Sequence, residues 1–227
     1  VRSRRQRQMC IRDSLKALTV FAMPMILGGF FQQVYNMADS IIVGQFVGSS
    51  ALAAVGACAA LTNVFIRVAL GAGVGAGVLV SRYFGAKEYD KMKTIVSTSL
   101  LSFLILSIVL GVFGLCFSRP MMRSLQTPPD ILDEAVLYLR VYFVGFPFLF
   151  MYNILSTMFT SIGESRIPLA LLIFSSVLNI FMDLWMVAGL GLGVFGAALA
   201  TLIAQGISAV FSLLIFCLLY TSPSPRD

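Results

Sequence analysis

Two long apolar stretches of this chain each contain a single charged residue. Asp39 is the only charged residue of positions 17–66, and Asp183 is the only one of positions 167–225. An apolar run of about 18 residues or more is typical of a helix that spans a bilayer. Of the whole chain, 59% of residues are hydrophobic and 11% are charged, whereas a soluble domain has roughly 25% charged residues. We therefore predict an all-α, polytopic membrane protein.

The apolar runs divide into six expected membrane-spanning helices. Turns that are rich in glycine, proline or charged residues separate them. The expected spans are 17–43, 51–80, 94–117, 131–161, 167–190 and 197–220. We expect the fourth span to be one continuous helix, entered through an amphipathic turn.

Basic residues are concentrated in the connections on one side of these spans. That side carries Lys16, Arg82, Lys87, Lys91, Lys93 and Arg166, whereas the other side carries Arg119 and Arg123. Because cytoplasmic loops of membrane proteins have an excess of Lys and Arg, we predict a multi-pass protein of the plasma membrane with a cytoplasmic N-terminus. The surplus of 16 basic over 10 acidic residues follows this topology and does not indicate a nucleic-acid partner.

The residue types that most enzymes use are scarce. The chain contains no histidine, and its four cysteines are too dispersed for a metal site. Histidine is the commonest general base and metal ligand, so its absence argues against an enzyme. We expect neither catalytic residues nor a dedicated metal centre.

The two ends of the chain differ from its apolar body. Residues 1–14 are rich in arginine, and residues 221–227 read Thr-Ser-Pro-Ser-Pro-Arg-Asp. Both ends resemble translated sequencing-adaptor sequence, so we interpret them as non-native and assign the protein itself to residues 15–220. A disordered, basic cytoplasmic arm that contacts anionic lipid is the alternative for residues 1–14.

The first span carries a stripe of polar residues. Gln32, Asn36 and Ser40 are spaced by four residues, and Asp39 lies three residues after Asn36, so they share one face of a helix. In lipid such a face must contact protein or water. Hydrogen bonding between helices is an equal explanation for Gln32 and Asn36. It does not require an ionisable group, so we interpret Asp39 as functional.

A second polar group is expected where the fifth and sixth spans meet. Asn179 and Asp183 lie one helical turn apart, and Thr201 lies in the sixth span. An amide, a carboxylate and a hydroxyl together can bind a proton, a sodium ion or an ammonium group. For Thr201, a hydrogen bond back to its own helix is an equally good explanation.

Two further features have structural explanations. The glycine-rich stretch 71–77 lacks the preceding strand that a dinucleotide-binding motif needs, and we interpret its glycines at spacing four as contacts for close helix packing. Arg67 and Arg140 lie within or near spans. We expect Arg140 to reach the interface or to pair with Asp133 or Glu134.

Several segments together resemble the multidrug and toxic compound extrusion (MATE) transporters. They are Gln-Gln-Val-Tyr-Asn-Met-Ala-Asp at 32–39, Ser-Arg-Tyr-Phe-Gly-Ala-Lys at 81–87, Tyr-Leu-Arg at 138–140, Asn179 with Asp183, and Gly-Ala-Ala-Leu-Ala-Thr at 196–201. The resemblance covers nearly all of residues 15–220 with matching order and spacing. It is specific as a composite.

This resemblance implies the N-terminal lobe of a transporter that has two six-helix lobes around a central cavity. It implies export of organic cations and drugs across the plasma membrane, the inner membrane of a bacterium, by antiport with H⁺ or Na⁺ and without another cofactor. By motif match, the coupling-ion and substrate site falls on Asp39, Asn179, Asp183, Thr201 and Tyr138. The polar stripe adds Asn36 and Gln32. A bound Na⁺ would contact Asp39, Asn179 and Asp183.

The length of the chain departs from the MATE pattern, because only one lobe is present. The expected partners are therefore organic cations, membrane lipid and a missing C-terminal lobe. Three alternatives stay open: a related flippase for lipid-linked saccharides, a membrane-embedded enzyme, and a non-transporting scaffold. A flippase needs a cationic cavity for pyrophosphate, an enzyme needs a catalytic base or metal, and a scaffold leaves Asp39 and Asp183 unexplained.

Overall fold

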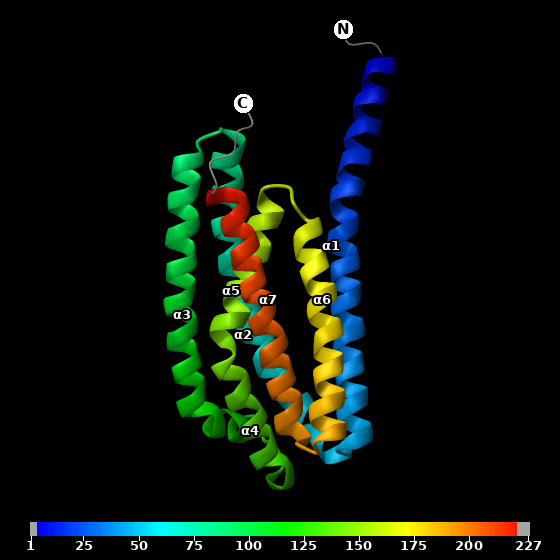
Figure 1. Cartoon of the computed structure of the whole chain (residues 1–227), viewed down its shortest axis with the longest axis vertical. Coiled ribbons are helices and arrows are strands. Elements are labelled where there is room, and N and C mark those ends of the chain that lie inside the picture. The colour runs from blue at the N-terminus through cyan, green and yellow to red at the C-terminus, as the bar shows by residue number, and fades with distance from the viewer. Residues whose placement is uncertain (1–3, 222–227) are drawn as a thin grey trace.

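The computed structural model describes the backbone of residues 4–221, and side chains from residue 19 to 218 apart from 21, 69 and 72. Over this range the chain forms helices and turns without a strand. The helices are α1 (Arg4–Phe46), α2 (Ser49–Gly85), α3 (Tyr89–Ser124), α4 (Pro129–Val144), α5 (Phe146–Ser161), α6 (Arg166–Asp183), the π-helical segment η1 (Leu184–Gly189) and α7 (Gly193–Thr221). They run up and down along one long axis (Figure 1). The predicted all-α class is confirmed.

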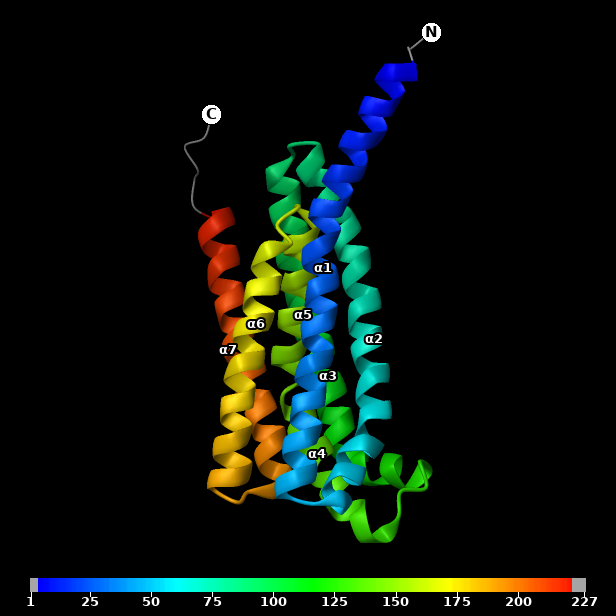
Figure 2. The ribbon, with the colours of Figure 1, turned by 90° about the vertical axis from the view of Figure 1, so that its right-hand side faces the viewer.

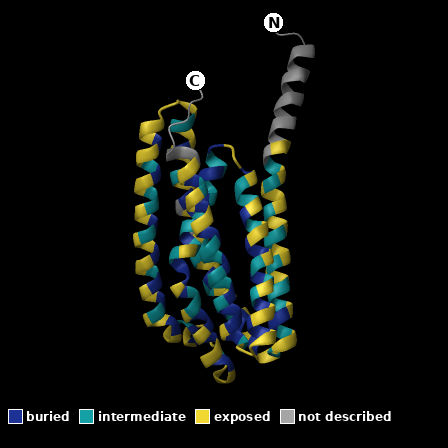
Figure 3. Ribbon diagram, in the orientation of Figure 1, coloured by how far each residue is buried: buried dark blue, intermediate teal, exposed yellow. Residues whose placement is uncertain are grey.

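Most of the helices are suited to a membrane. By length and composition, α2, α3, α6 with η1, and α7 can each cross it, and α4 with α5 makes a fifth span if the bent pair counts as one. The described part of α1 does not meet this criterion of length and composition, although α1 runs along the bundle as its sixth helical element. Large apolar side chains such as Val109 and Phe113 are exposed. Exposed positions recur along the outer helices, where lipid would cover them (Figure 3).

Four helices, α1, α2, α3 and α7, are longer than the expected spans, and the turns are shorter. α1 and α2 are separated only by Val47 and Gly48, and α3 continues through Pro120 to Ser124. An apolar run marks the part of a helix inside the bilayer, and the helix can continue into water beyond it. α1 also includes residues 4–14, which we had set apart. The rest of the two terminal segments, apart from residue 221, lies outside the described residues.

The fourth span is broken, contrary to the expectation of one continuous helix. α4 and α5 meet at Gly145 with a bend of 53°. Pro147 follows in the first turn of α5. Proline has no N–H to donate and its ring clashes with the carbonyl group four residues earlier, here that of Phe143, so the helix cannot pass straight through. The bend redirects α5 relative to α4.

Large aromatic side chains are fully buried where α3, α4 and α5 meet. Phe143, Phe146 and Phe150 are almost completely buried, and their rings pack together with that of Phe65 from α2. Gly114 of α3 permits this packing, because a Cβ atom there would overlap the ring of Phe143. This aromatic core holds the helices that surround the cavity described below.

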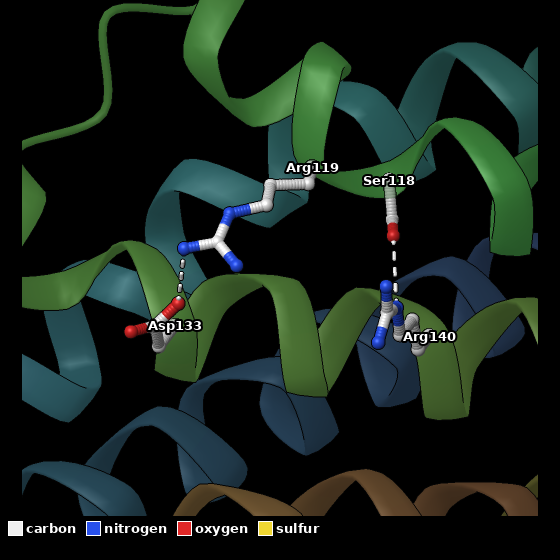
Figure 4. Close-up of polar contacts among 4 residues, drawn as sticks. All are labelled: Ser118, Arg119, Asp133 and Arg140. Atoms are coloured by element: carbon white, nitrogen blue, oxygen red, sulfur yellow. Dashed lines mark hydrogen bonds and ion pairs between the residues drawn. The ribbon is translucent and has the colours of Figure 1, made fainter.

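The connections divide between the two ends of the bundle. The start of α1, the α2–α3 turn and the α5–α6 turn lie at one end, and the α1–α2, α3–α4 and α6–α7 turns lie at the other (Figures 1 and 2). This is the alternation on which the count of basic residues relied. At the second end, Arg119 pairs with Asp133 at 3.0 Å, and Arg140 Nε donates to Ser118 Oγ at 3.2 Å (Figure 4). The expected pairing of Arg140 with an acid is therefore wrong.

Candidate functional site

The two membrane-embedded aspartates meet inside the bundle. Asp39 projects from α1, and Asp183 is the last residue of α6, the helix that lies beside α1 (Figure 2). Their carboxyl groups are within hydrogen-bonding reach of one another, and Asp183 is completely buried. Neither acid forms a salt bridge with a described residue. Two carboxylates this close repel each other, and one shared proton or one bound cation removes that repulsion.

Asn179 connects this acid pair to α7. Its amide is best satisfied when Nδ2 donates to Asp183 Oδ2 at 2.8 Å and Oδ1 accepts from the backbone N–H of Thr201 at 3.2 Å. In the opposite orientation it reaches only Thr201 Oγ1, at 3.4 Å. Asn179 is 1% exposed, so these groups lie away from water. The hydrogen bonds couple the position of Asp183 to that of α7.

Thr201 links the acid cluster to the tyrosine beside it. Its Oγ1 donates to the carbonyl of Ala197 at 3.1 Å and lies 3.5 Å from the hydroxyl of Tyr35. Since its proton is directed to Ala197, Tyr35 is the donor in the second contact. The hydrogen bond back to its own helix, which the sequence left as an alternative, is thus present, and one lone pair of the oxygen is still available.

Three buried oxygens near this cluster have no hydrogen-bond partner within the described part of the chain. They are Asp39 Oδ1, Asp183 Oδ1 and Gln205 Oε1. Buried polar atoms are normally paired, so orphaned acceptors indicate a proton, a cation or water in the working protein. Among the described residues, no three His, Cys, Asp or Glu side chains form a metal cluster. A sodium ion would therefore depend on two carboxylates and neutral oxygens.

A cavity of about 680 Å³ opens beside the acids. Its walls come from five helices, namely α1, α2, α4, α5 and α7. They are lined by Gly29, Gln32, Gln33, Tyr35, Asn36, Asp39, Ser40, Val55, Ala59, Thr62, Asn63, Ile66, Arg67, Leu70, Tyr138, Tyr142, Gly145, Leu149, Tyr152, Asn153, Ala198, Thr201, Leu202 and Gln205. The volume is in the usual range for sites that hold a drug-sized molecule.

The cavity brings together most of the residues that the sequence predicted as a site. Five of them line its walls: Gln32, Asn36, Asp39, Tyr138 and Thr201. The other two, Asn179 and Asp183, lie buried behind the wall and reach it through Asp39 and Thr201. The predicted set is thus one contiguous group, in which Asp39 belongs to both the cavity and the acid pair.

The polar stripe of α1 forms a network along one wall. Gln32 Nε2 donates to Asn36 Oδ1, and Asn36 Nδ2 donates to Gln33 Oε1, both at 3.3 Å. Ser40 Oγ donates to the backbone carbonyl of Asn36 at 2.9 Å. All of these contacts lie within α1. Among the described residues, the side chains of Gln32 and Asn36 therefore do not hydrogen-bond to a neighbouring helix, which was the alternative explanation.

Aromatic side chains of the cavity were missed as site residues. Tyr35, Tyr142 and Tyr152 line it, and the rings of Tyr138 and Tyr142 stack 6.3 Å apart. Faces of aromatic rings attract organic cations. The spacing of four between Tyr138 and Tyr142 was the available signal, because it places both rings on one face of α4.

Comparison with known proteins identifies relatives across most of the chain. The MatE family model matches residues 24–185. The probable multidrug resistance protein YoeA of Bacillus subtilis is 31% identical over 193 residues, which are 83% of this chain and 42% of YoeA. The multidrug export protein MepA of Staphylococcus aureus strain N315 is 29% identical over 201 residues, which are 88% of this chain and 45% of MepA.

Solved structures agree with this assignment. A crystal structure of MATE in the bent conformation superposes with a TM-score of 0.83 at 28% identity, covering 92% of this chain and 46% of that one. A Pyrococcus furiosus transporter of the MOP superfamily, described as having a binding pocket of reverse polarity, gives 0.84 at 28% identity, covering 93% and 46%. The chain thus spans somewhat less than half the length of its relatives. Since the family model matches well over half of the chain, this chain belongs to the MatE family of MATE transporters.

Proposed function

We propose that this chain is one six-helix lobe of a cation-coupled antiporter that exports organic cations and drugs in exchange for H⁺ or Na⁺. The observation that carries the proposal is the pair Asp39 and Asp183, which meet in the apolar bundle with two orphaned carboxylate oxygens. Acids at such depth are costly and are kept for ions, protons or cationic ligands. Of the relatives named above, MepA is described as a multidrug export protein and YoeA as a probable multidrug resistance protein.

Asp39 is the residue at which ion and substrate compete. It faces the cavity and also contacts Asp183. With the pair ionised, the cavity attracts an organic cation, and the tyrosine rings beside it contribute cation–π contacts. When a proton or Na⁺ neutralises the pair, that attraction is lost and the substrate leaves. Exchange follows because each ligand binds the state that the other does not.

The second lobe is part of this proposal. We infer that it completes the cavity from the opposite side, and that the bundle lies in the plasma membrane with the N-terminus in the cytoplasm. Sequencing the source DNA beyond both edges of this segment tests the first inference. Six further apolar spans in frame after residue 220 are expected. A stop codon directly after α7 would instead require two copies of this lobe to pair.

The decisive experiment replaces Asp183 by Asn in the complete protein that contains this segment. Efflux of a fluorescent organic cation from cells should fall to background, while the protein is expressed and inserted normally. Asp133→Asn is the matched control, because Asp133 is an exposed acid that does not line the cavity. Wild-type efflux by Asp183→Asn would overturn the proposal. In everted vesicles, release driven by a pH jump or by a Na⁺ jump identifies the coupling ion.

A further inference from the structure

Arg67 occupies an unexpected place for a charged residue. It is the middle residue of the 37-residue helix α2. At 1.5 Å per residue it lies about 27 Å from either end of that helix, which is farther than its side chain can reach. The hydrocarbon core of a bilayer is about 30 Å thick, so Arg67 lies near the midplane. A charged residue at that depth indicates a functional site.

Arg67 is an exposed residue that lines the cavity. The residues of α2 that line the cavity are Val55, Ala59, Thr62, Asn63, Ile66, Arg67 and Leu70. Their spacings of three and four residues define one helical face. The neighbouring positions Val64 and Val68 are among the exposed apolar residues, and they lie outside this face. The guanidinium group is therefore presented to the cavity.

The charge of Arg67 has no ion-pair partner among the residues that the structure describes. No described residue forms an ion pair or a hydrogen bond with its side chain. Within the described cavity wall, Asp39 is the one acidic residue. From their positions on the antiparallel helices α1 and α2, the two residues lie about 15 Å apart along the bundle axis. An arginine that only joined helices would have an acidic partner nearby.

There is room beside the guanidinium group for a ligand. Gly29 of α1 lines the cavity at nearly the same height as Arg67. A Cβ atom added at Gly29 would have no neighbour within 4 Å. The cavity thus has an acidic end at Asp39 and a cationic end at Arg67, with open space at the latter.

We propose that Arg67 is the anion-binding residue of this cavity, so that the preferred substrates are elongated amphiphiles with a cationic group at one end and a carboxylate at the other. The planar guanidinium donates two parallel hydrogen bonds to a carboxylate, which a single positive charge cannot match. The cationic end of the ligand lies at Asp39 and the tyrosines. This inference rests on the proposed function and names the substrate class of the same site.

The test compares two probes that differ by one charge. The first is a rod-shaped styrylpyridinium dye with a carboxylate at its far end, and the second is the methyl ester of the same dye. Binding of each is measured by fluorescence to the purified complete protein. The variants are Arg67→Gln and Arg67→Lys, with Arg82→Gln as the matched control, because Arg82 is an exposed arginine in the last turn of the same helix.

The expected result is a selective loss. Arg67→Gln weakens binding of the carboxylate dye by about tenfold or more, the contribution of a hydrogen bond to a charged group, and changes binding of the ester less than about twofold. Arg67→Lys gives an intermediate loss, and Arg82→Gln changes neither. Asp183→Asn, in contrast, abolishes export of both dyes. A wild-type protein that exports neither dye contradicts the proposed function itself.

Three outcomes would overturn this inference, and the first two of them would leave cation export intact. The first is an equal loss for both dyes, which indicates a structural role. The second is no loss for either dye. The third is that an isoprenyl pyrophosphate displaces the carboxylate dye through Arg67 while the ester does not bind, which indicates a lipid-linked substrate.

Discussion

Two regions of this bundle use the same helices in opposite ways. Where α3 meets α4 and α5, the aromatic core around Phe143 and Phe146 leaves no space, and even Gly114 cannot accept a methyl group. Where α1 faces α2, α4, α5 and α7, a cavity of about 680 Å³ is bordered by amides, tyrosines, an acid and an arginine. α4 and α5 belong to both regions.

The difference shows how one lobe combines a stable frame with a changeable site. In lipid, burial of apolar side chains contributes little to helix association, so close packing has to hold the helices. The dense region supplies that packing. In the hollow region, polar groups that can bind and release ligands take the place of closely packed apolar side chains. Substitutions should therefore lower stability in the first region and alter transport in the second.

The largest loss of stability is expected from Phe146→Ala. Phe146 is fully buried and packs against Phe65, Phe143, Phe150 and Tyr142, so its removal leaves a cavity and should lower the free energy of unfolding by about 3–5 kcal/mol. Thermal unfolding of the complete protein in detergent measures the change.

Phe181→Ala is the control for that substitution. The Phe181 side chain is 67% exposed, so little change in the unfolding temperature is expected. Equal shifts in the two variants would show that the aromatic core is not the stabilising region.

A pair of glycine substitutions sharpens the same contrast. In Gly114→Ala the new methyl group would meet the ring of Phe143, and overpacking of this kind costs about 1–3 kcal/mol. In Gly75→Ala the methyl group meets nothing within 4 Å, and alanine favours a helix over glycine. The first variant should unfold at a lower temperature than wild type and the second at the same or a higher one. Shifts of the same sign would contradict the difference in packing.

In the hollow region, Thr201→Val is expected to alter transport more than stability. The change keeps the side-chain shape but removes the hydroxyl that contacts Tyr35, at a cost of about 1 kcal/mol. Export of an organic cation should require several-fold more coupling ion, whereas Thr201→Ser should behave like wild type. If the valine variant transports normally, the hydroxyl serves only its own helix.

The smallest effect is expected outside both regions. Arg119 and Asp133 form an exposed pair, with side chains 50% and 83% accessible. Such pairs contribute about 0.2–1 kcal/mol. Arg119→Gln should shift the unfolding temperature slightly in dilute buffer and not at all in high salt, because salt screens exposed charges. A large, salt-independent loss would mean that this end of the bundle also belongs to the stabilising frame.

Much of the site could be predicted from local patterns. Of the residues that line the cavity from α1, Gln32, Asn36 and Ser40 were identified by their spacing. Asp39 and Asp183 were identified by their charge within apolar runs. The glycines were only half predictable: Gly73 and Gly77 pack against Thr157 and Ser161 of α5, whereas a Cβ atom added at Gly71 or Gly75 would meet nothing within 4 Å. A spacing of four places residues on one face of a helix, but it does not reveal which face meets a neighbour.

The sequence by itself determined the membrane class, the order of the helices and the chemistry of the two acids, because hydropathy and helical periodicity are properties of a short segment. Only the tertiary structure decided that Asp39 meets Asp183, that α4 bends away from α5 at Gly145, and that Arg67 lines the cavity without an ion-pair partner among the described residues. These depend on how helices distant in sequence pack and cross. Packing is settled by the whole set of side-chain shapes at once, and no single segment contains that information.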